Sequence, residues 1–209
     1  MCSECNDGHP RPIGTGGYGE TADVLVKQYE SLAFADVHHD LLHLFPATPS
    51  HVLDIGAGTG RDAAAFAKLD HAVTAVEPTP ELRAHAQRLH SDLAITCIDD
   101  SLPDLDRVHA LGERYDLVML TAVWMHLDKP QREHAMGRVA PLARPDGVMV
   151  LSLRHGPVPA GRRMFEVSAD ETRELAARYG LATIHDSEHR SLLGGLAVWW
   201  SRLAFRAQR

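Results

Sequence analysis

Glycine and acidic residues gather in one stretch of the chain, which reads His51-Val-Leu-Asp-Ile-Gly-Ala-Gly-Thr-Gly-Arg-Asp62. A short apolar run, typical of a buried strand, enters the glycines, and an alanine-rich helical pattern follows them. Gly56 and Gly58 allow a sharp turn and a close approach of a ligand to the backbone, because a Cβ there would intrude. The stretch therefore predicts a strand, a turn and a helix that together hold a ligand.

Acidic residues also end the next two apolar runs. Glu77 lies 17 residues after Gly60, where a carboxylate can accept hydrogen bonds from both hydroxyls of a ribose. Such charge-assisted bonds contribute about 1.5–3 kcal/mol. The following run ends in Asp99, Asp100 and Ser101, which are placed to meet an adenine amino group. These positions predict a ligand that contains a nucleoside.

Two details separate this pattern from a dinucleotide site. The spacing is Gly56-x-Gly58-x-Gly60, whereas the dinucleotide pattern requires a glycine at position 61, which is Arg61. Asp54 stands just before the glycines, where a carboxylate is unfavourable beside a pyrophosphate but suits the amino group of a methionine moiety. The pattern favours S-adenosylmethionine (AdoMet), with a NAD-dependent oxidoreductase as the alternative.

Four segments, VLDIGAGTGRDA, VEP, CIDDSLP and YDLVMLTAVWMHL, resemble motifs I to IV of class I AdoMet-dependent methyltransferases of the small bacterial type. The resemblance covers about residues 50–155. It implies AdoMet as cofactor, S-adenosylhomocysteine (AdoHcy) as product, and Trp124 as a wall of the cofactor pocket. The cofactor-binding residues on this interpretation are Asp54, Gly56, Ala57, Gly58, Gly60, Arg61, Asp62, Glu77, Pro78, Asp99, Asp100, Ser101, Thr121, Ala122 and Trp124.

Four residues are candidates for the acceptor side of the site. His126 follows the fourth strand and is either a general base, a substrate contact or an ordinary histidine at the sheet rim. Arg154 and His155 follow the fifth strand, and Arg154 either clamps a carboxylate or phosphate or pairs with a surface acid. Tyr18 is the large aromatic residue of a glycine-rich segment that we expect to cover the site.

Alternating strand and helix patterns predict parallel β-α units with helices on both faces. With the resemblance, the expected fold is a Rossmann-like, doubly wound α/β sheet of seven strands, one of them antiparallel. Helices are expected over Thr21–Phe45, with a second short helix from Leu41, and over Asp62–Leu69, Thr79–His90, Lys129–Leu142 and Ser168–Tyr179. Strands are expected over His51–Ile55, Ala72–Val76, Leu93–Ile98, Tyr115–Leu120, Gly147–Leu153, Leu181–Glu188 and Leu196–Phe205, the last two forming an antiparallel pair.

The same patterns divide the chain into a flexible segment, 1–19, and a single methyltransferase domain, 20–209. Within the domain we expect a helical cap over 20–45, a cofactor-binding core over 50–155, and a C-terminal helix with the antiparallel strand pair over 168–209. Because the cap is short and little sequence is inserted, a small-molecule methyl acceptor is favoured over a macromolecule. A non-catalytic AdoMet-binding module is the alternative from another class.

Composition bounds the partners and the compartment. A net charge of −7 and a pI near 6.0 disfavour nucleic acid as a partner. Neither a membrane-spanning run nor a signal core is visible, so a cytoplasmic protein without a membrane partner is expected. The sequence leaves open whether it is a monomer or a homodimer. Three cysteines disfavour a disulfide framework. The pattern of Cys2, Cys5 and His9 is too sparse for a metal site, so no metal is expected.

Overall fold

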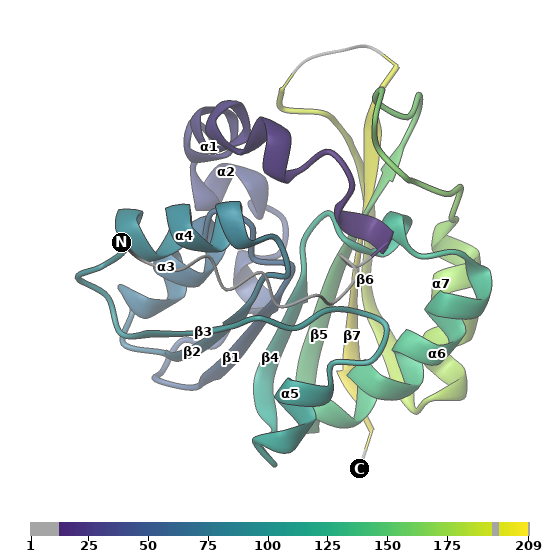
Figure 1. The fold of residues 1–209 in the computed structure, drawn as a ribbon. Coiled ribbons are helices and arrows are strands. Elements are labelled where there is room, and N and C mark those ends of the chain that lie inside the picture. Colours follow the sequence, from purple (N-terminus) through teal and green to yellow (C-terminus); the bar gives the residue numbers. More distant parts are fainter. Residues whose placement is uncertain (1–12, 194–196, 209) are drawn as a thin grey trace.

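In the computed structural model, which describes residues 13–193 and 197–208, the strands form one mixed sheet (Figure 1). Cys2, Cys5, His9 and most of the predicted flexible segment lie outside these ranges. The seven-stranded sheet has the order β3-β2-β1-β4-β5-β7-β6. The strands are β1 (His51–Ile55), β2 (Ala72–Val76), β3 (Ile95–Ile98), β4 (Tyr115–Leu120), β5 (Ala143–His155), β6 (Leu181–Arg190) and β7 (Trp199–Ala207).

Strand direction confirms the predicted fold class. The pairs from β3 through β5 are all parallel, whereas β7 runs antiparallel to both of its neighbours, β5 and β6. The strand pair at the end of the chain is therefore antiparallel, as its short connection predicts. The sheet is a doubly wound, Rossmann-like one with a single reversed strand.

The helices follow the prediction less closely before the sheet than within it. The helical stretch expected over 21–45 is divided once more than predicted: its first part forms α1 (Ala22–Glu30) and α2 (Phe34–Val37), and the second short helix expected from Leu41 is the 3-10 helix η3 (Leu42–Leu44). The break brings the Phe34 ring against Phe66 and buries Leu41 completely, which one straight helix does not do. The other helices are α3 (Arg61–Ala67), α4 (Pro80–Leu89), the unpredicted α5 (Asp106–Ala110), α6 (Lys129–Val139) and α7 (Ala169–Arg178), with 3-10 turns η1 (Ile13–Thr15), η2 (Gly19–Thr21), η4 (Trp124–His126) and η5 (Ala140–Leu142).

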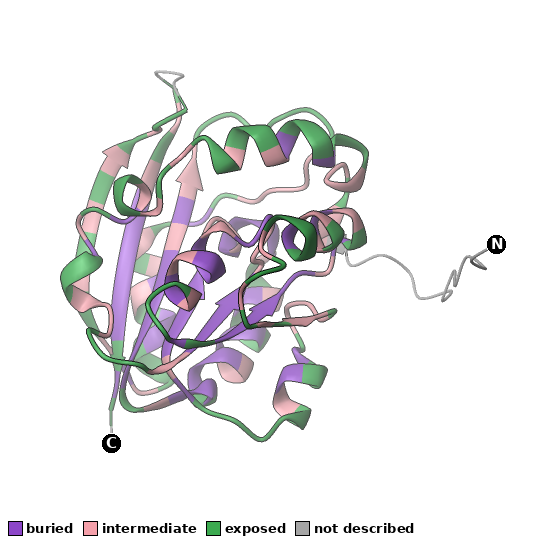
Figure 2. Ribbon diagram, turned by 90° about the vertical axis from the view of Figure 1, so that its left-hand side faces the viewer, coloured by how far each residue is buried: buried purple, intermediate pink, exposed green. Residues whose placement is uncertain are grey.

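Alternate residues of the central strands bury the two faces of the sheet separately. Val52 and Leu117 face one core with Phe66 of α3, whereas Leu53 and Val118 face the other, which α5, α6 and α7 cover. The central strands are buried and the helices carry exposed outer faces (Figure 2). With both faces filled, ligands can enter only at the carboxyl ends of the strands. No helix of the described residues is long and apolar enough to cross a bilayer.

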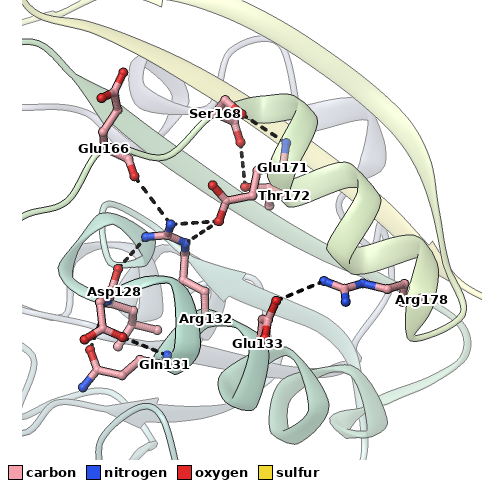
Figure 3. Close-up of polar contacts among 10 residues, drawn as sticks. Asp128, Gln131, Arg132, Glu133, Glu166, Ser168, Glu171, Thr172 and Arg178 are labelled. Carbon is pink, nitrogen blue, oxygen red and sulfur yellow. Dashed lines mark hydrogen bonds and ion pairs between the residues drawn. The ribbon is translucent and has the colours of Figure 1, made fainter.

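Polar contacts fix α6 and α7 against each other at that end of the sheet (Figure 3). Asp128 and Gln131 form a reciprocal capping box at the start of α6. The buried Arg132 guanidinium donates to Glu171 at 2.8 Å and to the Leu127 carbonyl at 2.6 Å. Ser168 caps α7 by accepting from the Glu171 amide. These bonds hold the segment around η4, which precedes α6, in a fixed position.

Candidate functional site

The glycine turn after β1 takes a backbone form that only glycine adopts without strain. Gly56, Gly58 and Gly60 have φ of +72°, +57° and +79°. A Cβ on Gly56 would lie 2.4 Å from Cγ2 of Val123. The turn is held from behind, because the amides of Gly56 and Ala57 both donate to the carbonyl at the end of β2. Its open side faces the cavity described below.

Asp54 is buried on β1 just before this turn and has an unsatisfied oxygen. Its side chain is 2% exposed, and Oδ2 has no hydrogen-bond partner among the described residues. Burial, and then the charge of Asp62, raise the pKa of the Asp54 carboxyl well above its usual range. A cationic group placed against Oδ2 would relieve both costs, so this carboxyl fits an ammonium group of a ligand.

Glu77 links the ends of β1 and β2. Its Oε2 accepts from the Gly58 amide at 2.8 Å, and its Oε1 accepts from the Thr79 amide at 2.8 Å. Burial raises the pKa of the Glu77 carboxyl, while these two amides oppose that rise. The carboxylate therefore stabilises the glycine turn itself, and the residue lines the cavity at the carboxyl ends of the strands.

Asp62, in the first turn of α3, accepts hydrogen bonds from three side chains. It accepts from His38 at 2.8 Å, from Thr121 at 3.0 Å and from Arg61 at 2.7 Å. His38 and Arg61 hold the pKa of this buried carboxyl well below its usual range against the opposing effect of burial. The network joins α2, α3 and the end of β4, and it fixes the directions of Arg61 and Thr121.

These groups open onto one cavity of about 960 Å³ at the carboxyl ends of the strands. Its walls come from the segment before α1, from α1, from the ends of β1, β2, β4 and β5, and from the hairpin between β6 and β7. In Figure 1 the purple segment that precedes α1 crosses over these strand ends. Most of the predicted cofactor residues line the cavity, namely Asp54, Gly56, Ala57, Gly58, Arg61, Asp62, Glu77, Pro78, Ser101, Thr121 and Ala122.

The four remaining predicted cofactor residues do not line the cavity. Trp124 is 1% exposed and packs in the core, so its predicted place as a pocket wall is wrong. Asp99 points to solvent and pairs with Arg83 at 3.0 Å. Asp100 accepts from the amides of Ser101 and Val108, so it stabilises the following turn.

Gly60 has a structural reason for being glycine. A Cβ there would lie 3.2 Å from Ala86 of α4, so the residue permits close packing of α3 and α4. Of the three residues after β3, the structure leaves only Ser101 on the cavity wall.

Tyr18 and His126 meet on the opposite side of the cavity. The Tyr18 hydroxyl lies 3.0 Å from Nε2 of His126, whose Nδ1 donates to the Arg163 carbonyl at 2.8 Å. Since Nδ1 carries the proton, Nε2 of the neutral ring accepts from the hydroxyl. Burial, with the charges of Arg162 and Arg163, lowers the pKa of His126. Burial also raises the pKa of Tyr18, so the phenol stays protonated.

Of the two predicted residues after β5, only one lines this cavity. Arg154 lines it and donates to the Pro157 carbonyl at 2.9 Å. His155 points away, stacks on Trp199 at 3.7 Å and bonds to Ser201, because successive residues of a strand face opposite sides. The predicted role of His155 in the site is therefore wrong.

The prediction missed several residues of the acceptor side. Arg162 lies over the Tyr18 ring at 3.7 Å and donates to the Gly16 carbonyl and to Thr21, so it ties the covering segment to the loop after β5. No sequence motif joins Arg162 to Gly16 and Thr21, because they lie in segments far apart in the sequence. The others that line the cavity include Leu25, Gln28, Tyr29, Arg163, Met164, Arg190, Leu192, Val198, Trp200 and Arg202.

Sequence comparison identifies the central part of the chain. A family model described as a methyltransferase domain matches residues 52–147, which contain the glycine turn, Glu77 and the end of β4. No curated protein sequence matches the chain.

Solved structures share the fold at low identity. An N-methyltransferase, NodS, from Bradyrhizobium japonicum WM9 is 16% identical with a TM-score of 0.66, and the match covers 90% of this chain and 99% of that one. A 1,6-didemethyltoxoflavin-N1-methyltransferase from Burkholderia thailandensis is 24% identical with a TM-score of 0.62, covering 96% and 93%. Magnesium protoporphyrin IX methyltransferase from Synechocystis PCC 6803, solved with its methyl donor bound, is 17% identical with a TM-score of 0.63, covering 92% and 80%.

Proposed function

Residues 52–147 are a methyltransferase domain of the class I, AdoMet-dependent type, and from this premise we propose that the protein transfers a methyl group to an O, N or S atom of a small molecule. The observation that carries the proposal is the buried Asp54 carboxyl, unsatisfied at Oδ2, beside a glycine turn and a second buried carboxylate. A structural core has no use for such a group, since an unpaired buried carboxyl is costly. A ligand with a cationic end removes that cost.

AdoMet supplies a methyl group activated on a sulfonium, and its methionine end carries an ammonium. Asp54 would hold the ammonium, and Glu77 would accept from the ribose hydroxyls with the lone pairs that its two backbone amides leave free. Ser101 would lie by the adenine, while Thr121 and Ala122 would lie by the sulfonium. Because Gly56 and Gly58 have no Cβ, the ligand could lie directly against the backbone of the turn.

Tyr18 and His126 form a route for a proton of the acceptor. The acceptor's proton passes to the Tyr18 oxygen as the Tyr18 hydroxyl proton passes to Nε2 of His126, so the phenol is regenerated neutral. The lowered pKa of His126 keeps Nε2 free to accept, and the raised pKa of Tyr18 keeps the hydroxyl a donor. An acceptor without a titratable proton would need the pair only for positioning.

The enclosure of the cavity supports a small acceptor. Residues from 14–37 line one side of the cavity and residues from 190–193 and 198–202 line another, so the reacting position is bounded on both sides. Two of the similar structures are named for methylation of a small molecule, 1,6-didemethyltoxoflavin in one and magnesium protoporphyrin IX in the other. We propose that residues 20–209 act as one domain and that the segment before α1 serves as its cover.

Calorimetry with AdoHcy, AdoMet and NAD tests the cofactor assignment. We expect binding of the first two and no measurable heat with NAD, and binding of NAD alone would overturn the proposal. Incubation with AdoMet labelled on its methyl group and a metabolite extract then tests the acceptor. The label is expected in the small-molecule fraction, whereas label confined to protein or nucleic acid would contradict a small acceptor. AdoHcy binding without transfer to any fraction would favour the non-catalytic module.

A further inference from the structure

The cavity is electrically divided. Three of its acidic side chains, Asp54, Asp62 and Glu77, come from the β1, β2 and α3 side, where Arg61 pairs with Asp62, and a fourth, Asp104, comes from the segment after β3. The opposite wall carries five arginines, from the end of β5, the loop after it and the β6–β7 hairpin: Arg154, Arg162, Arg163, Arg190 and Arg202. Because a cationic methyl donor suits the acidic side, the basic side is available to the other reactant.

Two of the five arginines are neutralised by carboxylates. Arg163 pairs with Asp128 at 3.1 Å, and Arg202 pairs with Asp40. Within residues 13–193 and 197–208, the other three make no ion pair with a carboxylate. Their charge is therefore free to act on a ligand, and desolvation lowers the pKa of Arg154, as expected for a cation withdrawn from water without a counter-charge.

Two of these arginines, Arg162 and Arg154, act on Tyr18 of the proposed proton route. The Arg162 guanidinium lies over the Tyr18 ring at 3.7 Å, and it uses only donors toward Gly16 and Thr21. Arg154 makes one bond, to the Pro157 carbonyl, and its positive charge acts on the Tyr18 hydroxyl. A guanidinium has five donors, so both retain free N–H groups. Arg190 is exposed at the rim of the same wall.

Apolar side chains fill the rest of this wall. Met164, Val198 and Trp200 line it half-buried, and Leu192 is 51% exposed at its edge. An indole face and aliphatic groups beside free guanidinium groups suit a flat apolar body that carries an anionic substituent.

From this arrangement, and resting on the proposed function, we propose that the methyl acceptor is an aromatic or otherwise apolar small molecule that bears a carboxylate or comparable anionic group. Arg154 and Arg162 bind that group beside Tyr18, and Arg190 attracts it at the entrance. The apolar body packs on Trp200 and Met164.

A matched pair of fluorescent dyes tests this, because anilinonaphthalene sulfonate differs from phenylnaphthylamine only in its sulfonate. With the AdoHcy-loaded protein, we expect the anionic dye to bind about tenfold more tightly than the neutral one. Arg154→Gln and Arg162→Gln should each weaken the anionic dye about five- to tenfold and leave the neutral dye within about twofold. Arg88→Gln, an exposed arginine on α4 outside the cavity wall, is the control and should change neither.

Equal affinity for the two dyes, no binding of the anionic dye, or indifference to both substitutions would overturn the inference. Arg190→Gln, which alters an exposed side chain, serves where Arg162→Gln does not fold, and a loss of about twofold or more is expected. AdoHcy calorimetry on the same samples reports on the proposed function separately. If the protein binds AdoHcy but shows no preference for the anionic dye, the proposed function stands and the proposal of an anionic acceptor is contradicted.

Discussion

The two sides of the cavity are built differently. The proposed cofactor side consists of the glycine turn and of acidic residues near the ends of β1 and β2, within residues 54–78, together with residues after β3 and β4. The proposed acceptor side consists of residues from 14–37, 154–164, 190–193 and 198–202, which meet only in the folded chain. The cofactor side is thus encoded locally, and the acceptor side is assembled by long-range packing.

This difference shows which part of the site depends on backbone shape and which depends on charge. A substitution on the cofactor side should disturb the turn that joins β1 to α3, and stability and affinity should change together. A substitution on the acceptor side should alter charge or proton position with little effect on the fold. The experiments below test that division, beginning with the largest expected effect.

Gly56→Ala should give the largest loss on the cofactor side. The position has φ of +72°, and the new Cβ would lie 2.4 Å from Val123 Cγ2. Left-handed backbone strain and overpacking together predict a loss of about 2–5 kcal/mol in the free energy of unfolding. Binding of AdoHcy should be lost with it. Denaturant unfolding and calorimetry measure the two effects.

Gly112→Ala is the matched control for that substitution. Gly112 has φ of +66°, but a Cβ there meets nothing within 4 Å among the described residues. It should lose only the strain, about 1–2 kcal/mol, and keep its AdoHcy affinity. Equal losses in the two variants would show that Val123 moves aside and that the turn is not tightly fitted.

Asp54→Asn separates binding from stability. The buried carboxyl has an unsatisfied Oδ2 and a raised pKa, so at neutral pH its ionisation works against folding. The free energy of unfolding should therefore stay the same or increase. AdoHcy affinity should fall by about 1.5–3 kcal/mol, roughly 10- to 100-fold, because the ammonium loses its charged partner. A destabilised variant with unchanged AdoHcy affinity would give Asp54 a purely structural role.

Much of the fold follows from the sequence because each β-α unit is local. Strands β1, β2 and β4 have the predicted bounds, since each is a short apolar run between turns. The break between α1 and α2 was not predictable, because helical spacing continues through a bend that the packing of Phe34 on Phe66 decides. The predicted fifth strand begins only at Gly147, because Arg144, Pro145 and Asp146 interrupt the apolar run. In the structure β5 already begins at Ala143.

The site follows the same division. Gly56, Gly58 and Glu77 line the cavity at the positions expected from their spacing, because a strand end fixes where its last side chain lies, whereas Gly60 does not line it. Trp124 fails because a hydrophobic residue after a strand can enter the core as readily as the pocket. Arg162 carries no local signal, since its contact with Thr21 joins residues 141 positions apart in the sequence and Tyr18 is still farther away.

Arg162→Gln should loosen the covering segment without unfolding the domain. The guanidinium donates to Gly16 and Thr21 and lies over Tyr18, and losing these contacts should speed amide exchange of Tyr18 and Thr21 about tenfold. Amides of β1 should keep their exchange rates, as should all amides in Arg88→Gln. AdoHcy should slow exchange of Tyr18 in the wild type if the segment closes over the site. Identical rates in every sample would leave it an idle segment.

Tyr18→Phe should give the smallest effect, a shift in the titration of His126. Burial is the main cause that lowers the pKa of His126 below 6.5, so the folded protein takes up this proton later than the unfolded chain as the pH falls. The stability that neutral His126 contributes is complete above pH 6.5 and declines as the pH falls from there to the folded pKa.

The Tyr18 hydroxyl donates to Nε2 only while His126 is neutral, so removing it should raise the pKa of His126. NMR titration of the ring protons measures this directly. His155 is the internal reference, because burial also lowers its pKa but its ring bonds to Ser201 instead. If His126 titrates at its usual pKa in the wild type, or if both histidines shift equally in Tyr18→Phe, then Tyr18 does not hold the neutral base, and the proton route from the acceptor to His126 is lost.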